Sequence, residues 1–228
     1  MHVDDTAERL PAGGGTQTSP PAADAGAHPK ITGSGWNSTW NTRLAADPNS
    51  LEAALKCDST YQTWTDTAGS NENMPMNCID WYEAFAFCAW DGGRLATEAE
   101  WNYAASGGSE QRYYPWSNPA TSTTVDTSYA VYSVFAVQNV GSKSPKGDGR
   151  WGQSDLGGKV HEWTLDWNAS PYPMPCSDCA DLVAAPWRVI RGGGVGWGAL
   201  HLRSADRFNE SDHYHVIHVG SRCARTSI

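Results

Sequence analysis

The stretch Asp91–Trp101 reads Asp-Gly-Gly-Arg-Leu-Ala-Thr-Glu-Ala-Glu-Trp and defines the start of a helix more clearly than any other part of the chain. The Thr97 hydroxyl can accept the backbone N–H of Glu100, while the Glu100 carboxylate can accept the N–H of Thr97. This reciprocal capping box predicts a helix that begins at about Glu98. Gly107-Gly108 can end it, because glycine readily adopts the left-handed conformation that follows a helix.

A second short helix is predicted just upstream. Asp80 can cap its N-terminus, Glu83 completes a similar box, and Gly92-Gly93 can end it. The apolar residues that fall on one face of this helix are Trp81, Phe85 and Cys88. In the whole chain, 12 tryptophans and 23 glycines stand beside only 18% charged residues, which favours tight turns packed around large aromatic side chains over a bundle of long helices.

Four sequence blocks occur in an order and spacing that resemble a known family. They are Asn77–Trp101 with Tyr114–Trp116, Asp155–Trp163 with Asp166-Trp167, Arg188–Gly194 with Leu202–Arg207, and Gly220–Arg225. Over about Met74 to Arg225 the chain is similar to the sulfatase-modifying-factor, or formylglycine-generating-enzyme, family. The resemblance implies an α+β fold, a loop-rich mixed fold related to C-type lectins with short helices and small antiparallel sheets.

The expected domain organisation is a linker followed by one domain. Residues 1–35 are rich in Pro, Ala and Gly and carry almost no large apolar side chain, so they cannot offset the entropy lost on ordering. We therefore predict a flexible linker over 1–35 and a sulfatase-modifying-factor-like domain over 36–228. The family usually has a further strand-rich segment before this point. Nothing ahead of Trp36 matches it, and we expect the domain to lack part of its N-terminal segment.

The cysteine content favours an exported protein. Six cysteines without repeated zinc-finger spacing are an even set that suits three disulfides, which persist in oxidising compartments. The family resemblance implies a bridge between Cys88 and Cys223. Cys57 and Cys78 flank a loop rich in Ser, Thr and Asn and would close it.

The pair Cys176 and Cys179 has three interpretations. A Cys-x-x-Cys pair can form a small local disulfide, act as a thioredoxin-like redox pair, or supply half of a zinc site. Here Pro171, Pro173 and Pro175 precede it, which is unlike the helix N-terminus on which a redox pair sits. A structural bridge is favoured, and the redox and zinc alternatives stay open.

Charge and hydropathy exclude two classes of partner. The net charge is −9 and no cluster of Lys or Arg offsets it, so binding to nucleic acid is not expected. No run approaches the ~18 consecutive apolar residues of a transmembrane helix. Met1 is not followed by the charged start and apolar run of a signal peptide, although the cysteines favour a periplasmic, cell-surface or secreted location.

The best-known activity of the family is not expected here. Active members use two cysteines after a Gly-Gly-Ser-like turn to hold copper(I), for which thiolates are suitable soft ligands. The corresponding segment, Gly192–Arg203, contains no cysteine. The resemblance then leaves two functions. One is a binding module for a peptide, protein or glycan, and the other is an oxidoreductase that depends on non-haem iron or another metal. The sequence does not decide whether the protein is an enzyme.

A structural calcium site is expected by resemblance. Asp155 and Glu162 occupy the positions whose side chains bind calcium in the family, and Gly158 and Val160 occupy those that contribute backbone carbonyls. A hard cation requires several oxygen ligands of this kind. Lys159 stands where the family usually has Asn and brings a positive charge nearby.

Histidines in the C-terminal part suggest a second kind of metal site. His201, His213 and His215, with Asp206 or Asp212, could supply two histidines and one carboxylate to iron. The alternative is a solvated, turn-rich loop that precedes the last strand.

Aromatic residues of the same region suggest a groove. Trp197 and His201 with Trp187 could line a groove for a peptide, or they could belong to the core. His161 takes the place of a usual family Trp, which suggests a variation in packing or at the surface.

Overall fold

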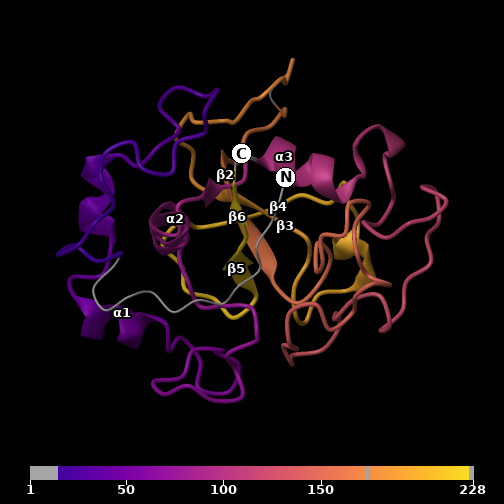
Figure 1. Cartoon of the computed structure of the whole chain (residues 1–228), viewed down its shortest axis with the longest axis horizontal. Coiled ribbons are helices and arrows are strands. Elements are labelled where there is room, and N and C mark those ends of the chain that lie inside the picture. Colours follow the sequence, from indigo (N-terminus) through magenta and orange to yellow (C-terminus); the bar gives the residue numbers. More distant parts are fainter. Residues whose placement is uncertain (1–14, 173–174, 226–228) are drawn as a thin grey trace.

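The computed structural model describes residues 15–172 and 175–225. Short helices and strands are joined by long loops (Figure 1). The helices are η1 Ser38–Arg43, α1 Pro48–Ala54, α2 Trp81–Trp90, α3 Glu98–Ala105, η2 Gly108–Glu110 and η3 Ala199–Leu202, where η denotes a 3-10 helix. The strands are β1 Arg94–Leu95, β2 His161–Trp167, β3 Arg188–Arg191, β4 Phe208–Glu210, β5 Val219–Ser221 and β6 Cys223–Ala224. The expected loop-rich α+β class is confirmed.

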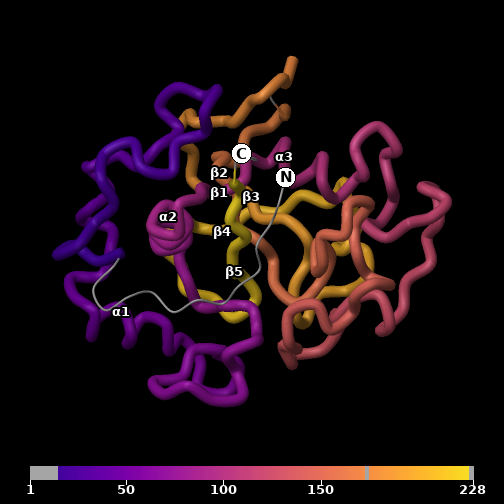
Figure 2. The backbone as a smooth tube through the Cα atoms, viewed as in Figure 1, coloured from indigo at the N-terminus to yellow at the C-terminus, as the bar shows by residue number. Residues whose placement is uncertain are grey.

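The central sheet has the strand order β4-β3-β2-β5. Strand β3 pairs antiparallel with β2 on one side and with β4 on the other. Strand β5 pairs with β2 in parallel, with His161 opposite Val219. This parallel pair differs from the antiparallel sheets that we expected. It is possible because the chain between β2 and β5 is long enough for the crossover that parallel pairing requires. In Figure 2 the sheet lies between α2 on the left and the loops from about residue 111 to 160 on the right.

Helix α2 begins and ends as the sequence predicts. The Asp80 carboxylate accepts the N–H of Glu83 at 2.8 Å, and the Glu83 carboxylate accepts the N–H of Asp80 at 3.1 Å. The helix is buried almost all round, because it lies between the sheet and the N-terminal segment. Its Trp81 indole donates to the carbonyl of Thr164 in β2 at 2.8 Å, which fixes the helix on the sheet.

Helix α3 also has its predicted capping box. Thr97 accepts the N–H of Glu100 at 3.1 Å, and Glu100 accepts the N–H of Thr97 at 3.0 Å. The helix ends before Gly107, whose φ of 65° is left-handed. Arg94 from β1 holds the Glu100 carboxylate with two bonds of 2.6 Å, so the box is joined to the two-stranded sheet of β1 and β6.

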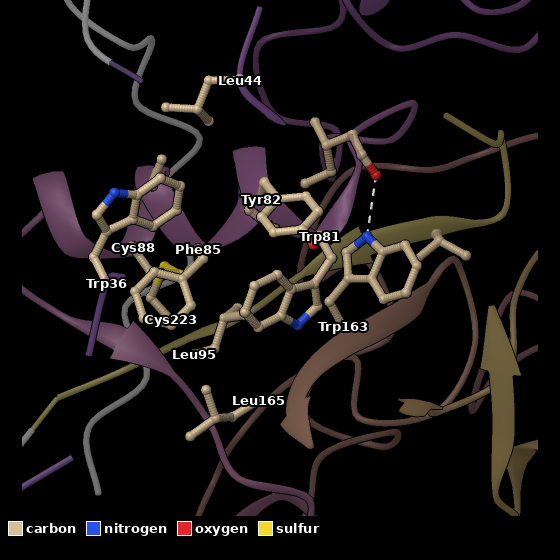
Figure 3. Packing of buried hydrophobic residues seen from close by; sticks show 14 of the residues in the cluster. Trp36, Leu44, Trp81, Tyr82, Phe85, Cys88, Leu95, Trp163, Leu165 and Cys223 are labelled. Carbon is tan, nitrogen blue, oxygen red and sulfur yellow. Dashed lines mark hydrogen bonds between the residues drawn. A yellow bond between two sulfur atoms is a disulfide. The ribbon is translucent and has the colours of Figure 1, made fainter. Parts of the chain in front are cut away.

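The main core is aromatic and lies between α2 and the sheet (Figure 3). Its buried members include Trp36, Trp81, Phe85 and Trp163, and the Trp163 indole donates to the carbonyl of Ile79 at 3.0 Å. Burial of these large rings supplies the main favourable free energy of folding, at about 25 cal/mol per Å² of apolar surface.

Arg188 of β3 is a cation inside this aromatic core. Its guanidinium carbon lies 3.5 Å from the Trp81 ring centroid and 3.6 Å from that of Trp167, and it donates to the carbonyl of Leu165 at 2.8 Å. Burial lowers the pKa of Arg188 to about 9. The charge is stabilised there by the faces of two indoles, which attract cations.

The six cysteines form three disulfides, Cys57–Cys78, Cys88–Cys223 and Cys176–Cys179. The three expected bridges are therefore confirmed, and the last pair forms the local bridge that the sequence favoured, which leaves no thiolate there for a zinc site. Cys88–Cys223 joins α2 to β6. The bridges suit an oxidising compartment.

Residues 15–35, part of the expected linker, form hydrogen-bonded turns. The N–H of Asp24 donates to the carbonyl of Trp36, and the N–H of Trp36 donates to that of Ala25, both at 2.9 Å. His28 is buried, and its Nε2 lies 3.3 Å from the Glu100 carboxylate. The order comes from backbone bonds and contacts with the domain, which the local composition does not reveal. The linker prediction for residues 1–14 lies outside the described residues.

Within the described ranges, no helix is both long and apolar enough to cross a membrane.

Candidate functional site

The segment after β3 passes close to its neighbours at three glycines. Gly192 and Gly193 have φ values of 96° and 75°, which favour glycine. A Cβ on Gly193 would lie 2.7 Å from the carbonyl oxygen of His201, and one on Gly194 would lie 2.8 Å from that of His218. The glycines therefore bring the following residues against β2 and the loop before β5.

A cluster of aromatic rings, which we call the Trp197 cluster, forms at this place. The ring centroid of Trp197 lies 4.7 Å from those of His201 and Phe208, 5.3 Å from that of His161 and 6.0 Å from that of His218. Trp197, His201, Phe208 and His218 are half-buried, and His161 at the start of β2 is buried beneath them. The structure thus brings Trp197 and His201, two of the three residues considered for a groove, into ring contact.

His161 has no hydrogen-bond partner at either ring nitrogen among the described residues, and only 1% of the residue is exposed. Burial, with smaller effects from His218 and His201, lowers the pKa of His161 to about 3. Burial also lowers the pKa of His218. The ring of His161 is therefore neutral and serves as a packing residue. This supports the packing interpretation of the sequence over the surface one.

His201 is oriented by a carboxylate. Its Nδ1 lies 3.0 Å from the Asp206 carboxylate, which also accepts a bond from Arg203 at 3.2 Å. A histidine held in this way keeps its other nitrogen free to face a ligand.

Exposed apolar residues adjoin the Trp197 cluster. The phenyl ring of Phe135, a residue that is 58% exposed, lies where a Cβ on Gly196 would approach to 2.7 Å. Tyr61 packs against Phe135 with 5.7 Å between ring centroids. Two backbone hydrogen bonds join the loop around Phe135 to the segment around Trp197. The N–H of Gly196 donates to the carbonyl of Val134 at 2.8 Å, and the N–H of Ser133 donates to that of Trp197 at 2.9 Å. We call Tyr61, Val134 and Phe135 the Phe135 rim. With the Trp197 cluster it forms an aromatic surface from three distant segments.

Trp187 does not join this surface in the described structure. It is 49% exposed and lies directly before β3. Its carbonyl accepts the N–H of Asn168. No ring contact links it to Trp197 within residues 15–172 and 175–225.

The histidines considered as iron ligands are separated from one another. His201 pairs with Asp206, His213 with Asp212 at 3.0 Å, and His215 with another carboxylate. The side chain of His213 is 58% exposed. The sequence spacing is short, but the loop directs each histidine to a different neighbour.

The structure contains a different group of possible metal ligands, which the sequence analysis did not identify. Asp80, Glu83 and His215 are the three His, Cys, Asp or Glu residues in the described ranges whose ligand atoms lie within 4.8 Å of one another. His215 Nε2 lies 2.9 Å from the Glu83 carboxylate. Burial lowers the pKa of His215, but the bond to Glu83 and the nearby carboxylate charges outweigh it, so this pKa is raised overall. Burial raises the pKa of Asp80 well above its usual range. No local pattern relates His215 to a cap 132 residues away.

The expected calcium ligands already have cationic partners. The Asp155 carboxylate lies 2.6 Å from the ammonium of Lys159, and that of Glu162 is bound by Arg222 at 2.8 and 3.0 Å. Glu162 also accepts the Trp101 indole N–H at 2.6 Å. A calcium ion would add two positive charges beside a buried ammonium, where charges are weakly screened. The residues as they lie do not fit calcium.

A polar cavity of about 290 Å³ lies at the end of α3. Its lining residues are Asn102, Ser106, Gln111, Arg112, Tyr113, Arg203, Ser204 and Ala205. Both arginines are engaged, Arg112 with Glu110 at 2.7 Å and Arg203 with Asp206. The cavity therefore presents no uncompensated charge from these arginines to a ligand.

Comparison with known proteins defines the class of this chain. Residues 28–227 match the family described as "Sulfatase-modifying factor enzyme 1-like domain". The chain belongs to this family, as its sequence blocks suggested.

Individual relatives include proteins with and without activity in their names. The "Formylglycine-generating enzyme" of Thermomonospora curvata is 30% identical over 168 residues, which cover 67% of this chain and 55% of that protein. The "Inactive C-alpha-formylglycine-generating enzyme 2" of Bos taurus is 30% identical over 175 residues, which cover 71% of this chain and 55% of that protein. This chain thus spans about half the length of these two relatives.

Among solved structures, PvdO from Pseudomonas aeruginosa resembles this chain with a TM-score of 0.57 and 22% identity, over 76% of this chain and 75% of that one. The Treponema denticola variable protein 1 gives the same TM-score and identity, over 75% and 78%. These likenesses support the shared fold.

Proposed function

We propose that this chain is a binding module of the sulfatase-modifying-factor family without copper-dependent formylglycine-generating activity. One observation carries the proposal: all six cysteines are in disulfides, and Gly192–Arg203 contains none. No thiolate is available to hold copper(I) without reduction of a bridge. The relatives named as inactive are in accord with this proposal.

The ligand surface in this proposal is the Trp197 cluster with the Phe135 rim. Half-buried and exposed rings such as Trp197 and Phe135 offer large contact area with little side-chain entropy to lose. The glycines at 196 and 198 are exposed, so their backbone is accessible to an extended chain. We favour a peptide segment of a partner protein over a glycan, because apolar and backbone contacts predominate here. The net charge of −9 favours a neutral or basic segment.

The location in this proposal is outside the cytosol. Three disulfides, one of which closes a separation of 135 residues, persist where thiols are oxidised. The chain is therefore proposed to act in a periplasmic, cell-surface or secreted setting.

Catalysis is tested with a cysteine peptide of the sulfatase type. The protein is incubated with the peptide, copper, reductant and oxygen, and the thiol and aldehyde forms are measured by mass spectrometry. We expect no aldehyde above a no-protein control, while the Thermomonospora curvata relative serves as positive control. Non-reducing peptide mapping after the reaction checks that the bridges persist. Turnover with the bridges intact would contradict the proposal.

Binding is tested with a peptide library displayed on phage. Peptides enriched on the protein should lose about 30-fold in affinity with Trp197→Ala, because loss of a central aromatic contact costs about 2 kcal/mol. Trp187→Ala removes an exposed indole away from the proposed surface and should leave affinity unchanged. Equal losses in both variants would contradict the proposed site.

A metal-dependent oxidoreductase is the second candidate, and the group Asp80, Glu83 and His215 supports it. The same residues also form the α2 capping box and a bonded histidine, so a metal must compete with those bonds. Metal analysis of protein purified without chelator distinguishes the two candidates. About one equivalent of iron, lost in His215→Gln, would favour the enzyme, while protein without bound iron would favour the binding module.

A further inference from the structure

We propose that the ammonium of Lys159 takes the place of the calcium ion implied by the family motif, so that this chain carries a structural cation on its own side chain. Lys159 stands where the family usually has Asn, and only 2% of its side chain is exposed. Lysine is rarely buried to this degree unless its charge is paired.

The partners of the ammonium are oxygens of the kinds that calcium binds. Lys159 Nζ lies 2.6 Å from a carboxylate oxygen of Asp155 and donates to the carbonyl of Asn139 at 2.6 Å. The same Asp155 oxygen accepts the N–H of Gly141 at 2.6 Å. A carboxylate and a backbone carbonyl from separate loops are typical ligands of a hard cation. The ammonium has three donors with which to replace such an ion.

The backbone fixes the lysine in this position. The Lys159 N–H donates to the carbonyl of Val131 at 2.9 Å, and its carbonyl accepts the N–H of Val195 at 2.8 Å. Lys159 and Asp155 have left-handed φ values of 65° and 57°, which are uncommon outside glycine. Such a conformation persists where surrounding contacts enforce it, and the backbone bonds of Lys159 supply such contacts.

The other half of the motif is neutralised separately. Arg222 binds the Glu162 carboxylate and also donates to the carbonyl of Ser154 at 2.9 Å, next to Asp155. Each acidic residue of the motif thus has its own fixed cation. With Lys159 and Arg222 in place, a calcium ion would meet two positive charges and no uncompensated carboxylate. The lysine instead ties the loop around Asn139 to the segment before β2 without a metal.

The test is thermal unfolding in chelator and in millimolar calcium chloride. Wild-type protein should have the same Tm in both. Lys159→Asn restores the usual family residue and leaves Asp155 without its cation, so its Tm in chelator should fall by about 10 °C, as expected for breaking a buried ion pair in a chain of this size. Calcium chloride should restore much of that loss, because calcium would bind the folded state alone.

A matched control is Lys30→Asn. Lys30 pairs with Asp178 at 2.9 Å, but the two side chains are 66% and 47% exposed. Its removal should change Tm little, because exposed ion pairs contribute little, and calcium should have no effect. Titration calorimetry with calcium chloride gives a second measurement, with no binding heat expected for the wild type and a stoichiometric signal for Lys159→Asn.

Three results would overturn the proposal. The first is a wild-type Tm that falls in chelator or a stoichiometric binding of calcium by the wild type. The second is a folded Lys159→Asn that calcium does not stabilise. The third is a Lys159→Asn chain that folds neither in chelator nor when produced with calcium. A variant that folds only with calcium would support the proposal.

Discussion

Replacing His161 by Phe should remove a source of acid sensitivity from this fold. The two rings have similar shapes, but phenylalanine has no ring nitrogen to leave unsatisfied. In the wild type both nitrogens of His161 are buried without a partner in the described structure, and its pKa is lowered to about 3. The folded state therefore does not take up a proton at this ring above about pH 4, whereas the unfolded chain does so below its ordinary pKa of ~6.5.

The magnitude follows from linkage between protonation and folding. Because the folded pKa is depressed relative to that of the unfolded chain, the histidine lowers stability progressively as pH falls from about 6.5 towards 3. At pH 5, which lies about 1.5 pH units below the ordinary histidine pKa, protonation stabilises the unfolded chain but not the folded protein. This difference amounts to about 2 kcal/mol. The wild type should therefore lose about 2 kcal/mol more than His161→Phe between pH 7 and pH 5.

The absolute stability at pH 7 contains two opposing contributions. Removal of the unsatisfied nitrogens favours the variant by about 1–3 kcal/mol. The imidazole already passes close to Gly194, since a Cβ placed on that glycine would lie 3.1 Å from the ring. The larger phenyl ring would crowd this place, and overpacking costs about 1–3 kcal/mol. The difference between the two pH values is independent of this packing effect and is the quantity to test.

The assay is urea unfolding followed by tryptophan fluorescence at pH 7 and pH 5. Equal m-values for the two proteins would show that the same surface is exposed on unfolding. If the variant loses as much stability as the wild type between these pH values, His161 accepts a proton in the folded state, and the reasoning from its unpartnered burial is refuted.

Two further perturbations test the core. Replacing Cys88 and Cys223 by Ala should lower the free energy of unfolding by about 5 kcal/mol, since their bridge spans 135 residues, and denaturant titration measures this loss; a loss below about 1 kcal/mol would contradict it. Arg188→Lys should cost about 3 kcal/mol, because an ammonium cannot stack its plane on Trp81 and Trp167, and an unchanged unfolding midpoint would show that the double stacking contributes little.

Local chemistry explains which parts of the fold were predictable. Both main helices were placed from their capping boxes, since Asp80 with Glu83 and Thr97 with Glu100 act within four residues. Helix α1 was missed, although Asp47 followed by a proline at the first helical position is a recognisable start signal.

The candidate site was predictable only in part. The absence of cysteine from the segment after β3 could be read directly, whereas the sequence left open whether Trp197 and His201 line a groove or belong to the core. The burial of His161 under Trp197 depends on contacts with β4 and the loop before β5, which no pattern in the sequence specifies. The group around His215 depends in the same way on long-range packing. In the calcium motif, Lys159 was visible as an unusual residue, but only the structure shows where its ammonium lies.

The parallel pairing of β5 with β2 has a consequence for folding during synthesis. Residues 219–224 contribute an outer strand of the main sheet, half of the smaller sheet, the guanidinium that neutralises Glu162 and one sulfur of the longest bridge. A ribosome that has released everything before them has produced a chain whose aromatic core still lacks one wall. We therefore expect cooperative folding only after this stretch has emerged, because the contacts that close the core are made late in synthesis.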